Sequence, residues 1–270
     1  MNWLWRKTKK MEFMVLPEWE KKGAIAVFSS RKGGHSKGAY DSLNLAYHVD
    51  DDPERVTKNR QSFIKAAGGD LNCAVCCEQV HGSKVVSVDE GMKGLGGSRY
   101  RNAISACDGM VCEQPGIYLM TFYADCFPIY FFDPHKKVIG LAHSGWKGTY
   151  DEIGVKMAEL MITRHGCQID NIEVFIGPGI QRCCFEIKDD LAKKAEEKFP
   201  DLKIIETNKQ GKLIWDLPLT IISSLQKTGI KKEFIYQCGL CTACDESLFF
   251  SYSRDGGITG RMGAAFALTL

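Results

Sequence analysis

The sequence lacks the features that mark several classes of protein. No apolar run approaches the ~20 residues that a membrane-spanning helix needs, and no internal repeat or low-complexity tract occurs in its 270 residues. Charge of one sign is not in excess, with 35 basic against 33 acidic residues, whereas a nucleic-acid-binding protein normally carries a basic excess on one face. We therefore expect no membrane and no nucleic acid among its partners.

The N-terminal residues lack the apolar core and the small-residue cleavage site of a secretory signal peptide. They hold instead two tryptophans, Trp3 and Trp5, and a cluster of basic residues. We therefore expect a cytoplasmic protein whose 12 cysteines stay reduced rather than form disulfides. Most of these thiols are expected in the core, where a free cysteine packs as a small hydrophobic group.

Two groups of cysteines are spaced closely enough to suggest a structural zinc site. Cys241 and Cys244 form a CxxC pair, and Cys73, Cys76 and Cys77 form a second group. Most of the chain separates the two groups, whereas a zinc ribbon keeps its paired ligands close in sequence. Core packing is therefore the favoured interpretation for most of these thiols.

The composition is that of an ordinary globular protein, with 44% hydrophobic and 25% charged residues. No linker-like stretch divides the chain, so we expect one domain over residues 1–270, with residues 1–23 as an N-terminal extension. Because the strand-like runs cluster mid-chain without a regular alternation of strand and helix, the pattern predicts an α+β fold with mixed sheets. The predicted strands lie at 23–28, 74–80, 84–88, 110–112, 117–123, 129–133, 138–142, 172–176, 234–237, 248–252 and 263–268.

Helices are predicted from capping signals and from the helical spacing of apolar residues. Asp52 and Pro53 begin one helix, because aspartate is a preferred N-cap and proline fits the first helical position. Thr149 and Glu152 have the spacing of a capping box and would begin another. Two further helices are expected around residues 189–199 and 218–228.

One charged residue falls on an apolar helix face. Arg60 follows Val56 by four residues and therefore lies on the same stripe of the first predicted helix. A guanidinium in such a position should have a partner or a ligand.

Histidine is scarce, with six residues in the chain. His81, Cys126 and His143 each lie at a break between strand-like segments, and loops held by rigid strands often carry reactive groups. Two imidazoles and one thiolate make a three-ligand set for catalytic zinc, with a fourth position for water or substrate. The alternative is that both histidines are structural and the cysteine lies in the core. The spacing of these residues along the sequence favours the structural alternative but does not exclude a zinc site. Metal ligands that come from three separate segments are not separated by any characteristic number of residues.

Longer motifs occur along the chain in a specific order. They are SSRKGGHSKGAYDSLNL at 29–45, Asn59-Arg60, QVHG at 79–82, ADCFP at 124–128, AHSGWKG at 142–148, IGPGIQRCCFEI at 176–187 and FFSYSRDGGITGR at 249–261. From about residue 25 onward the sequence resembles the YfiH/YlmD family, long labelled multicopper polyphenol oxidases or laccase-domain proteins. The resemblance implies an α-β-β-α layered fold, related to the catalytic domain of cytotoxic necrotizing factor toxins.

The resemblance also implies a metal site and an activity. His81, Cys126 and His143 match the family residues that bind one metal ion, usually zinc, and they would serve in catalysis. The implied activity is that of a purine nucleoside phosphorylase acting with phosphate on adenosine, inosine and methylthioadenosine. Adenosine deaminase activity is implied as well, for which zinc lowers the pKa of the attacking water toward ~7.

Three residues are expected to bind the substrates. Arg60 is the first candidate for phosphate and Arg254 the second, because cations stabilise the phosphate and the leaving group. Asn44 and the loop at 31–36 are weaker candidates for the nucleoside.

Three positions depart from the usual family motifs, at Lys147, Ser253 and Gly179. The first two replace arginines, and a lysine binds phosphate only as a point charge. None of the three is an expected metal ligand.

Other functions fit parts of the same pattern. A set of two histidines and one cysteine can also bind copper, so a copper-dependent polyphenol oxidase is one alternative, although the four remaining histidines are scattered and a multicopper enzyme needs many imidazoles. A hydrolase with Cys126 as nucleophile and His143 as base is a second. A zinc-dependent binding module without turnover is a third. The oligomeric state is left open.

Overall fold

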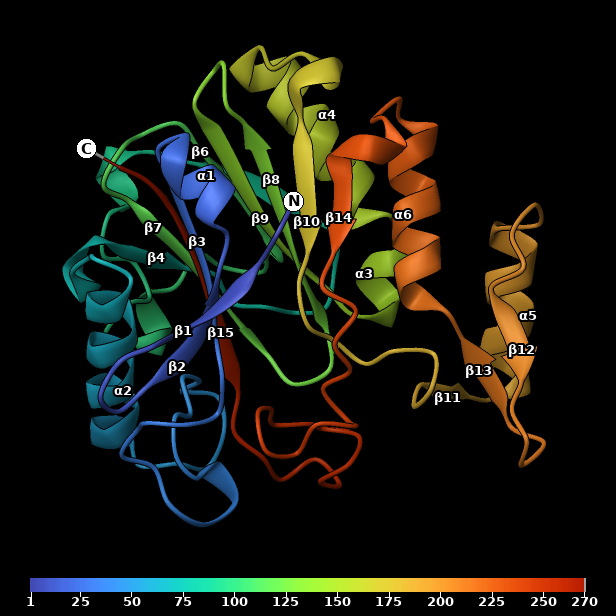
Figure 1. The fold of residues 1–270 in the computed structure, drawn as a ribbon, viewed down its shortest axis with the longest axis horizontal. Coiled ribbons are helices and arrows are strands. Elements are labelled where there is room, and N and C mark those ends of the chain that lie inside the picture. Colours follow the sequence, from blue (N-terminus) through green and yellow to red (C-terminus); the bar gives the residue numbers. More distant parts are fainter. Residues whose placement is uncertain (270) are drawn as a thin grey trace.

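Two six-stranded sheets form the body of the protein (Figure 1). The computed structural model describes residues 1–269. The first sheet consists, in spatial order, of β1 (Leu4–Lys7), β2 (Glu12–Val15), β3 (Ala24–Ser29), β15 (Met262–Leu268), β7 (Tyr118–Tyr123) and β4 (Ala74–Cys76). The second consists of β14 (Ile235–Gln237), β10 (Glu173–Ile176), β8 (Phe127–Asp133), β9 (Val138–Ser144), β6 (Gly109–Cys112) and β5 (Val85–Val88).

Both sheets combine parallel and antiparallel pairs. In the first sheet β4 runs parallel to β7, whereas β15 runs antiparallel to both of its neighbours. In the second sheet β5 and β14 each pair in parallel with a neighbour, while β8 and β9 form an antiparallel hairpin. The mixed sheets expected from the sequence are confirmed.

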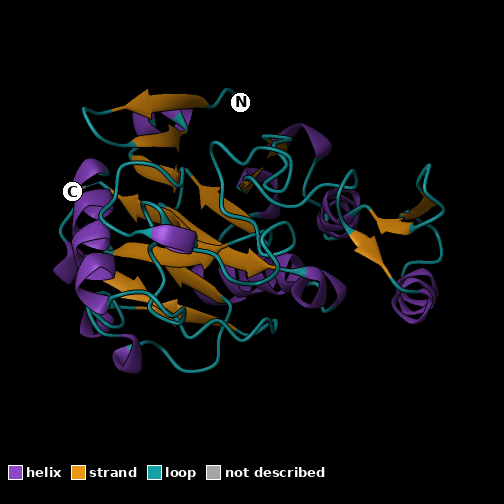
Figure 2. Cartoon of the chain, turned by 90° about the horizontal axis from the view of Figure 1, so that it is seen from below, coloured by secondary structure: helices purple, strands orange, loops and turns teal. Residues whose placement is uncertain are grey.

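Helices cover the outer faces of the sheets, and an apolar core lies between the sheets. Tyr130 and Phe266 come from different sheets and meet in this core with their ring centroids 5.4 Å apart. α2 (Pro53–Ala66) packs Phe63 and Ile64 against the first sheet. α4 (Ile153–His165) and α6 (Leu217–Lys227) pack against the second sheet. Figures 1 and 2 show the four layers, so the implied α-β-β-α arrangement is confirmed.

The layered packing explains why the central strands have no polar face. Along β15, Ala264 and Phe266 face the core between the sheets, while Ala265 and Ala267 face α2. Successive side chains of a strand point to opposite faces, and here both faces are covered. Every residue of β15 is buried, which accounts for the unbroken apolar run in the sequence.

The structure confirms one of the two predicted helix N-termini, at Asp52, and contradicts the other, at Thr149. The Asp52 carboxylate accepts a hydrogen bond from a backbone N–H of α2 at 2.9 Å, as predicted. The predicted capping box is wrong. Thr149 lies in a separate short helix, α3 (Trp146–Tyr150), where its hydroxyl bonds that of Ser144 at 2.9 Å. Glu152 adopts a φ of +55° as the chain turns from α3 into α4, and its side chain caps nothing.

Two strand predictions also need correction. The run at 74–80 ends as a strand at Cys76. Residues 248–252 form irregular structure between two turns rather than a strand. Phe249 and Phe250 in this segment are buried in the central core, so their hydrophobicity reflects packing and not strand pairing.

A small three-stranded sheet projects from the body, at the right of Figures 1 and 2. It consists of β11 (Glu186–Ile187), β13 (Leu213–Trp215) and β12 (Ile205–Thr207), and it carries α5 (Asp189–Lys198). Trp215 is fully buried at its base, where the indole N–H donates to the Thr220 hydroxyl of α6 at 2.9 Å.

The N-terminal segment is built into the first sheet. β1 pairs with β2, and β2 pairs with β3. α1 (Pro17–Lys21) buries Trp19 completely, and the indole N–H donates to Glu173 of β10 at 2.6 Å. Residues 1–23, expected as an extension, therefore connect the two sheets.

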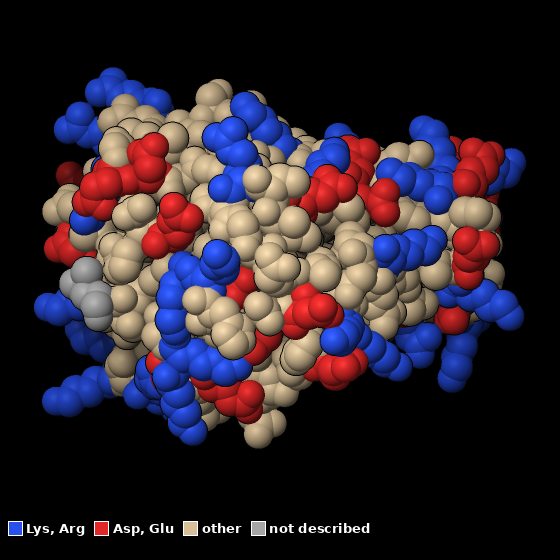
Figure 3. All heavy atoms as spheres, turned by 90° about the horizontal axis from the view of Figure 1, so that it is seen from above, with Lys and Arg blue, Asp and Glu red and all other residues tan. Residues whose placement is uncertain are grey.

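Acidic and basic side chains are interspersed over the face shown in Figure 3, without a patch of one sign covering it. This agrees with the balanced composition. Among residues 1–269, no helix has both the length and the apolar character to cross a bilayer.

Replacing Trp19 tests the role of the N-terminal segment. Trp19→Ala should lower the free energy of unfolding by ~3–5 kcal/mol, because it removes a large buried side chain. Trp19→Phe keeps most of the ring but removes the donor to Glu173, and should cost ~1–3 kcal/mol. Urea unfolding at constant pH measures both. A Trp19→Ala protein as stable as the parent would show that the segment is dispensable.

Candidate metal centre and active site

Neighbouring strands of the second sheet bring two of the candidate ligands together. β8 pairs with β9 so that Phe127 lies opposite Ser144. Cys126 comes directly before Phe127, and His143 directly before Ser144. On the other side of β9, the backbone N–H of His143 donates to the carbonyl of Asp108 at 2.7 Å, one residue before β6.

The Asp108 carboxylate holds the third ligand in place. His81 lies in the loop between β4 and β5, and its backbone N–H donates to Oδ1 of Asp108 at 3.0 Å. The N–H groups of Gly82 and Val80 donate to Oδ2 at 2.7 and 3.3 Å. Nδ1 of His143 lies 2.8 Å from Oδ1 and donates to it. One fully buried carboxylate therefore sets the positions of both histidines.

The three candidate ligands converge. One nitrogen or sulfur atom from each of His81, Cys126 and His143 lies within 4.8 Å of the other two. Ligand atoms around one tetrahedral zinc ion are about 3.3–3.8 Å apart, so small side-chain rotations fit all three to a single ion. Since Asp108 occupies Nδ1 of His143, Nε2 is the nitrogen that faces the cluster, as in carboxylate–histidine–metal arrangements.

The close approach requires glycine at position 145. A Cβ atom there would lie 2.7 Å from Sγ of Cys126 and 3.5 Å from the His81 ring. Solvent exposure decreases across the cluster, since His81 is exposed, Cys126 is half-buried and His143 is buried.

Mutual electrostatics favour the charged forms of Cys126 and His143. Burial opposes a thiolate at Cys126, but His143 and His81 outweigh it and lower the pKa of the thiol to about 6. Burial likewise opposes an imidazolium at His143, but Cys126 and Asp108 raise its pKa to about 9. Burial also opposes ionisation of Asp108, yet the hydrogen bonds from His143 and the loop N–H groups bring its pKa below the ordinary value. The metal-free site therefore holds a thiolate–imidazolium pair beside the Asp108 carboxylate, and a metal ion bound at Nε2 of His143 would take the place of the proton there.

Two residues at the cluster adopt strained backbone conformations. His81 has a φ of +59° and Asp125 a φ of +88°, a region that costs non-glycine residues about 1–3 kcal/mol. The buried side chain of Asp125 accepts hydrogen bonds at 2.7 Å from the Thr242 hydroxyl and from the backbone N–H of Ser253. The Asp108 and Asp125 carboxylates thus hold the two strained loops.

The structure places Arg60 away from any open site, contrary to the expected phosphate contact. Its side chain is 1% exposed, and Nε and Nη1 donate to backbone carbonyls, those of Leu45 at 2.6 Å and of Gly96 at 2.8 Å. The guanidinium lies 4.1 Å from the ring centroids of both Tyr47 and Phe122. The partners expected for a guanidinium on an apolar helix face are therefore backbone carbonyls and aromatic rings of the protein, and not a ligand.

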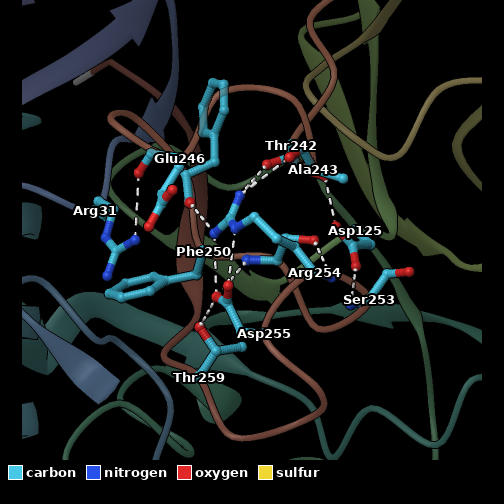
Figure 4. A network of polar contacts seen from close by, with 12 residues as sticks. Arg31, Asp125, Thr242, Ala243, Glu246, Phe250, Ser253, Arg254, Asp255 and Thr259 are labelled. Carbon is cyan, nitrogen blue, oxygen red and sulfur yellow. Dashed lines mark hydrogen bonds and ion pairs between the residues drawn. The ribbon is translucent and has the colours of Figure 1, made fainter. Parts of the chain in front are cut away.

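Arg254 is used in the same way (Figure 4). Its guanidinium forms two hydrogen bonds with the Asp255 carboxylate, at 2.8 and 3.1 Å. The remaining hydrogen bonds go to backbone carbonyls, including those of Thr242 at 2.9 Å and Phe249 at 3.0 Å. Arg254 therefore ties together the turns of the 242–255 loop rather than facing a phosphate.

Asn44 is also a structural residue. It is fully buried, and its amide bonds Ala46 through both its nitrogen and its oxygen. Its oxygen also accepts from the Arg261 backbone N–H at 2.9 Å, and its nitrogen donates to Asp51 at 2.9 Å. The three residues expected to bind substrate thus have their hydrogen bonds within the protein, and the geometry gives none of them a phosphate or nucleoside contact.

Sequence reasoning missed several residues that the structure brings to the cluster. Asp108 carried no signal beyond a carboxylate at the start of a strand. Arg261 lies close enough for the charges of Cys126 and Asp125 to act on it, and its guanidinium lies 5.7 Å from the Tyr252 ring centroid. Its Nη1 donates to the carbonyls of Thr259 at 2.6 Å and Gly260 at 3.1 Å, whereas Nε and Nη2 make no hydrogen bond to residues 1–269.

Three exposed apolar side chains lie in the chain segments that carry the cluster and its supporting loop. Val80 is the neighbour of His81, Trp146 follows Gly145, and Tyr252 precedes the residue whose N–H binds Asp125. These three side chains are 49%, 37% and 57% exposed. Flat apolar groups around a charged cluster suit a ligand with an aromatic ring.

Comparison with known proteins identifies the family of the chain. A family described as "Multi-copper polyphenol oxidoreductase laccase" matches residues 25–269. The chain is 37% identical to the purine nucleoside phosphorylase YlmD of Geobacillus stearothermophilus over 243 residues, which covers 89% of this chain and 88% of that protein. The chain belongs to the YfiH/YlmD family.

Other members differ in the activity for which they are named. Adenosine deaminase RL5, from an unknown prokaryotic organism, is 30% identical over 88% of this chain and 91% of its own length. Among solved structures, Bacillus licheniformis YfiH covers 98% of both chains at 34% identity with a TM-score of 0.91. YlmD from Geobacillus stearothermophilus covers 100% of both chains at 33% identity with a TM-score of 0.92. The YfiH/YlmD fold is therefore shared over the whole chain.

Replacing Asp108 tests whether its carboxylate positions the metal ligands. Asp108→Asn should weaken zinc binding by about 10–100-fold, the usual effect of removing a hydrogen-bond partner of a metal-binding histidine. Competition with a chromophoric chelator measures the affinity. Glu113→Gln is the matched control, because Glu113 pairs with Nδ1 of His165 at 2.9 Å outside the cluster. Equal affinities in both variants would contradict a positioning role for Asp108.

Proposed function

We propose that this protein is a zinc-dependent purine nucleoside phosphorylase that also deaminates adenosine. The observation that carries the proposal is the convergence of His81, Cys126 and His143 within 4.8 Å at a solvent-accessible edge of the sheets. Membership of a family with relatives named for both activities supports it.

Zinc is the metal that we propose for this centre. Two imidazoles and a thiolate form a three-ligand catalytic zinc set that leaves one position open. Zinc held there would act as a Lewis acid and activate water near neutral pH.

The protein groups supply orientation and charge. Asp108 keeps the His143 proton on Nδ1 and so directs Nε2 to the cluster. In phosphorolysis, phosphate attacks C1′ of the ribose while the bond to the purine nitrogen breaks, giving ribose 1-phosphate and the free base. In deamination, water adds at C6 of adenine and ammonia leaves. We propose that Trp146 and Tyr252 stack on the base and that Arg261 provides the positive charge near phosphate, in place of Arg60 and Arg254.

Copper oxidase chemistry has less support. A multicopper cluster needs several imidazoles together. In the part of the chain that the structure describes, the only other group of three or more potential ligands consists of cysteines. His165, one of the four remaining histidines, has both ring nitrogens in contact with Ser87 and Glu113.

Product analysis tests the proposed activities. Metal-analysed protein should convert adenosine, inosine and methylthioadenosine to free bases only when phosphate is present, and should convert adenosine to inosine without phosphate. His81→Ala and Cys126→Ser should lose both activities by at least ~100-fold, because each removes a metal ligand. Chromatography of the products measures this. Phosphorolysis that survives full metal removal would refute the shared site.

The pH dependence of Cys126 alkylation separates this proposal from a metal-free cysteine hydrolase. Since the Cys126 pKa is lowered to about 6, iodoacetamide labelling in metal-free protein should rise with pH through about 6 and then level off. An ordinary thiol would keep gaining reactivity toward its pKa near 8.5. Peptide mass spectrometry measures the labelling at this residue.

Zinc and His143→Ala provide the controls for this measurement. Zinc should protect Cys126, since a coordinated thiolate is a poorer nucleophile. His143→Ala should move the labelling midpoint to higher pH, because it removes the charge that favours the thiolate. Fast labelling that zinc does not slow would favour the hydrolase.

A further inference from the structure

A second group of cysteines lies where the projecting sheet joins the body. Cys183 and Cys184 lie in a turn that Phe185 separates from β11, and in this turn the N–H of Cys184 donates to the carbonyl of Gln181 at 2.9 Å. Cys241 and Cys244 lie in the loop that follows β14. The two segments are about 60 residues apart in the sequence, which is why the spacing gave no sign of a common site.

Backbone pairing brings these two segments together. Gly179 and Cys241 form an isolated parallel bridge. The N–H of Gly179 donates to the carbonyl of Leu240 at 3.3 Å, and the N–H of Thr242 donates to the carbonyl of Gly179 at 3.2 Å. The turn and the loop are therefore held side by side by main-chain contacts, independently of the cysteine side chains.

The four thiols form one compact group. All four Sγ atoms lie within 4.8 Å of one another. Sγ of Cys244 is 3.5 Å from that of Cys183 and 3.4 Å from that of Cys184. Four sulfurs around one tetrahedral zinc ion, with Zn–S bonds of about 2.3 Å, are about 3.8 Å apart. A disulfide would instead single out one pair at about 2.05 Å, and all four residues are free thiols.

None of the four thiols is fully buried, although Cys184 packs against the edge of the core under the second sheet. Cys183 and Cys244 are exposed, and Cys184 and Cys241 are half-buried, so the expectation of core packing is wrong for this group. The backbone N–H of Gln181 points at Sγ of Cys241, 3.5 Å away. An N–H donor to sulfur helps to hold a thiolate in place.

We propose that Cys183, Cys184, Cys241 and Cys244 bind a single zinc ion as a closed, structural site, separate from the His81–Cys126–His143 centre. Four thiolates fill the tetrahedral positions, so the site has no open position for catalysis. The thiols release their protons as the ion binds, and the ion closes a loop of the chain that contains the whole projecting sheet.

The position of this site gives it a structural role near the candidate active site. Thr242, between two of the four cysteines, donates to the Asp125 carboxylate at 2.7 Å, and Asp125 directly precedes Cys126. The main chain of Thr242 and Ala243 also accepts hydrogen bonds from Arg254 (Figure 4). An ion at the four cysteines would therefore hold the loop that supports the Cys126 turn.

Metal content measured on the whole protein tests the proposal. Protein purified under reducing conditions should contain two zinc ions per chain by elemental mass spectrometry. Cys241→Ser/Cys244→Ser should contain one, and so should His143→Ala, which empties the other centre. Cys73→Ser is the matched control, a half-buried cysteine outside both groups, and should keep two.

Cobalt substitution identifies the ligands of the second ion. Cobalt-loaded His143→Ala protein should show the intense near-ultraviolet absorption of thiolate-to-cobalt charge transfer. The same variant carrying Cys241→Ser/Cys244→Ser should lose that absorption. If the double serine variant does not fold, Cys244→His at an exposed position should keep the ion and change the cobalt spectrum.

Two results would overturn the proposal. One is a parent protein with a single zinc ion whose content is unaffected by Cys241→Ser/Cys244→Ser. The other is a disulfide among the four cysteines, found by mass spectrometry, with no second ion bound after reduction.

Discussion

The buried Asp108 carboxylate is the contact on which the candidate site depends. A charge removed from water is costly unless it is fully hydrogen-bonded, and here four N–H groups satisfy it. Three of these come from the loop that carries His81 and one from the His143 ring. The hydrogen bonds to this one carboxylate therefore fix the loop that carries His81 and keep a proton on Nδ1 of His143. They also set the distance between these two candidate ligands, so the site is preorganised before a metal binds.

A similar logic operates on the Cys126 side. The chain passes from the first sheet to the second between β7 and β8, and Asp125 makes this turn in a strained conformation. The Thr242 hydroxyl and the Ser253 N–H hold its carboxylate. Arg254 in turn holds the loop that contains both donors. With the proposed ion at the four cysteines, three interactions would hold this C-terminal loop near Cys126: the ion, the hydrogen bonds to Asp125 and those from Arg254.

Arginine and asparagine residues show where inference from the sequence was misleading. Arg60 on an apolar helix face correctly indicated that a partner exists, but the partner proved to be backbone carbonyls and two aromatic rings. Arg254 and Asn44 lie in conspicuous motifs for the same structural reason. A polar residue in a buried loop must satisfy its donors, and a motif alone does not distinguish this need from contact with a substrate. The incorrect capping box at Thr149 has a related cause, because a chain reversal between α3 and α4 overrides a local signal.

The sequence by itself determined most of the local elements and the chemical inventory: the apolar runs of the buried strands, the Asp52 cap, and the presence of two histidines and a cysteine at strand ends. Its motifs also indicated the family and hence the layered fold. Only the tertiary structure decided which side chains meet. The register of β6, β9 and β8 places Asp108, His143 and Cys126 side by side, and a single bridge at Gly179 and Cys241 gathers four cysteines. Such convergence depends on strand pairing between distant segments, and that pairing is set by the packing of the two sheets rather than by any interval along the chain.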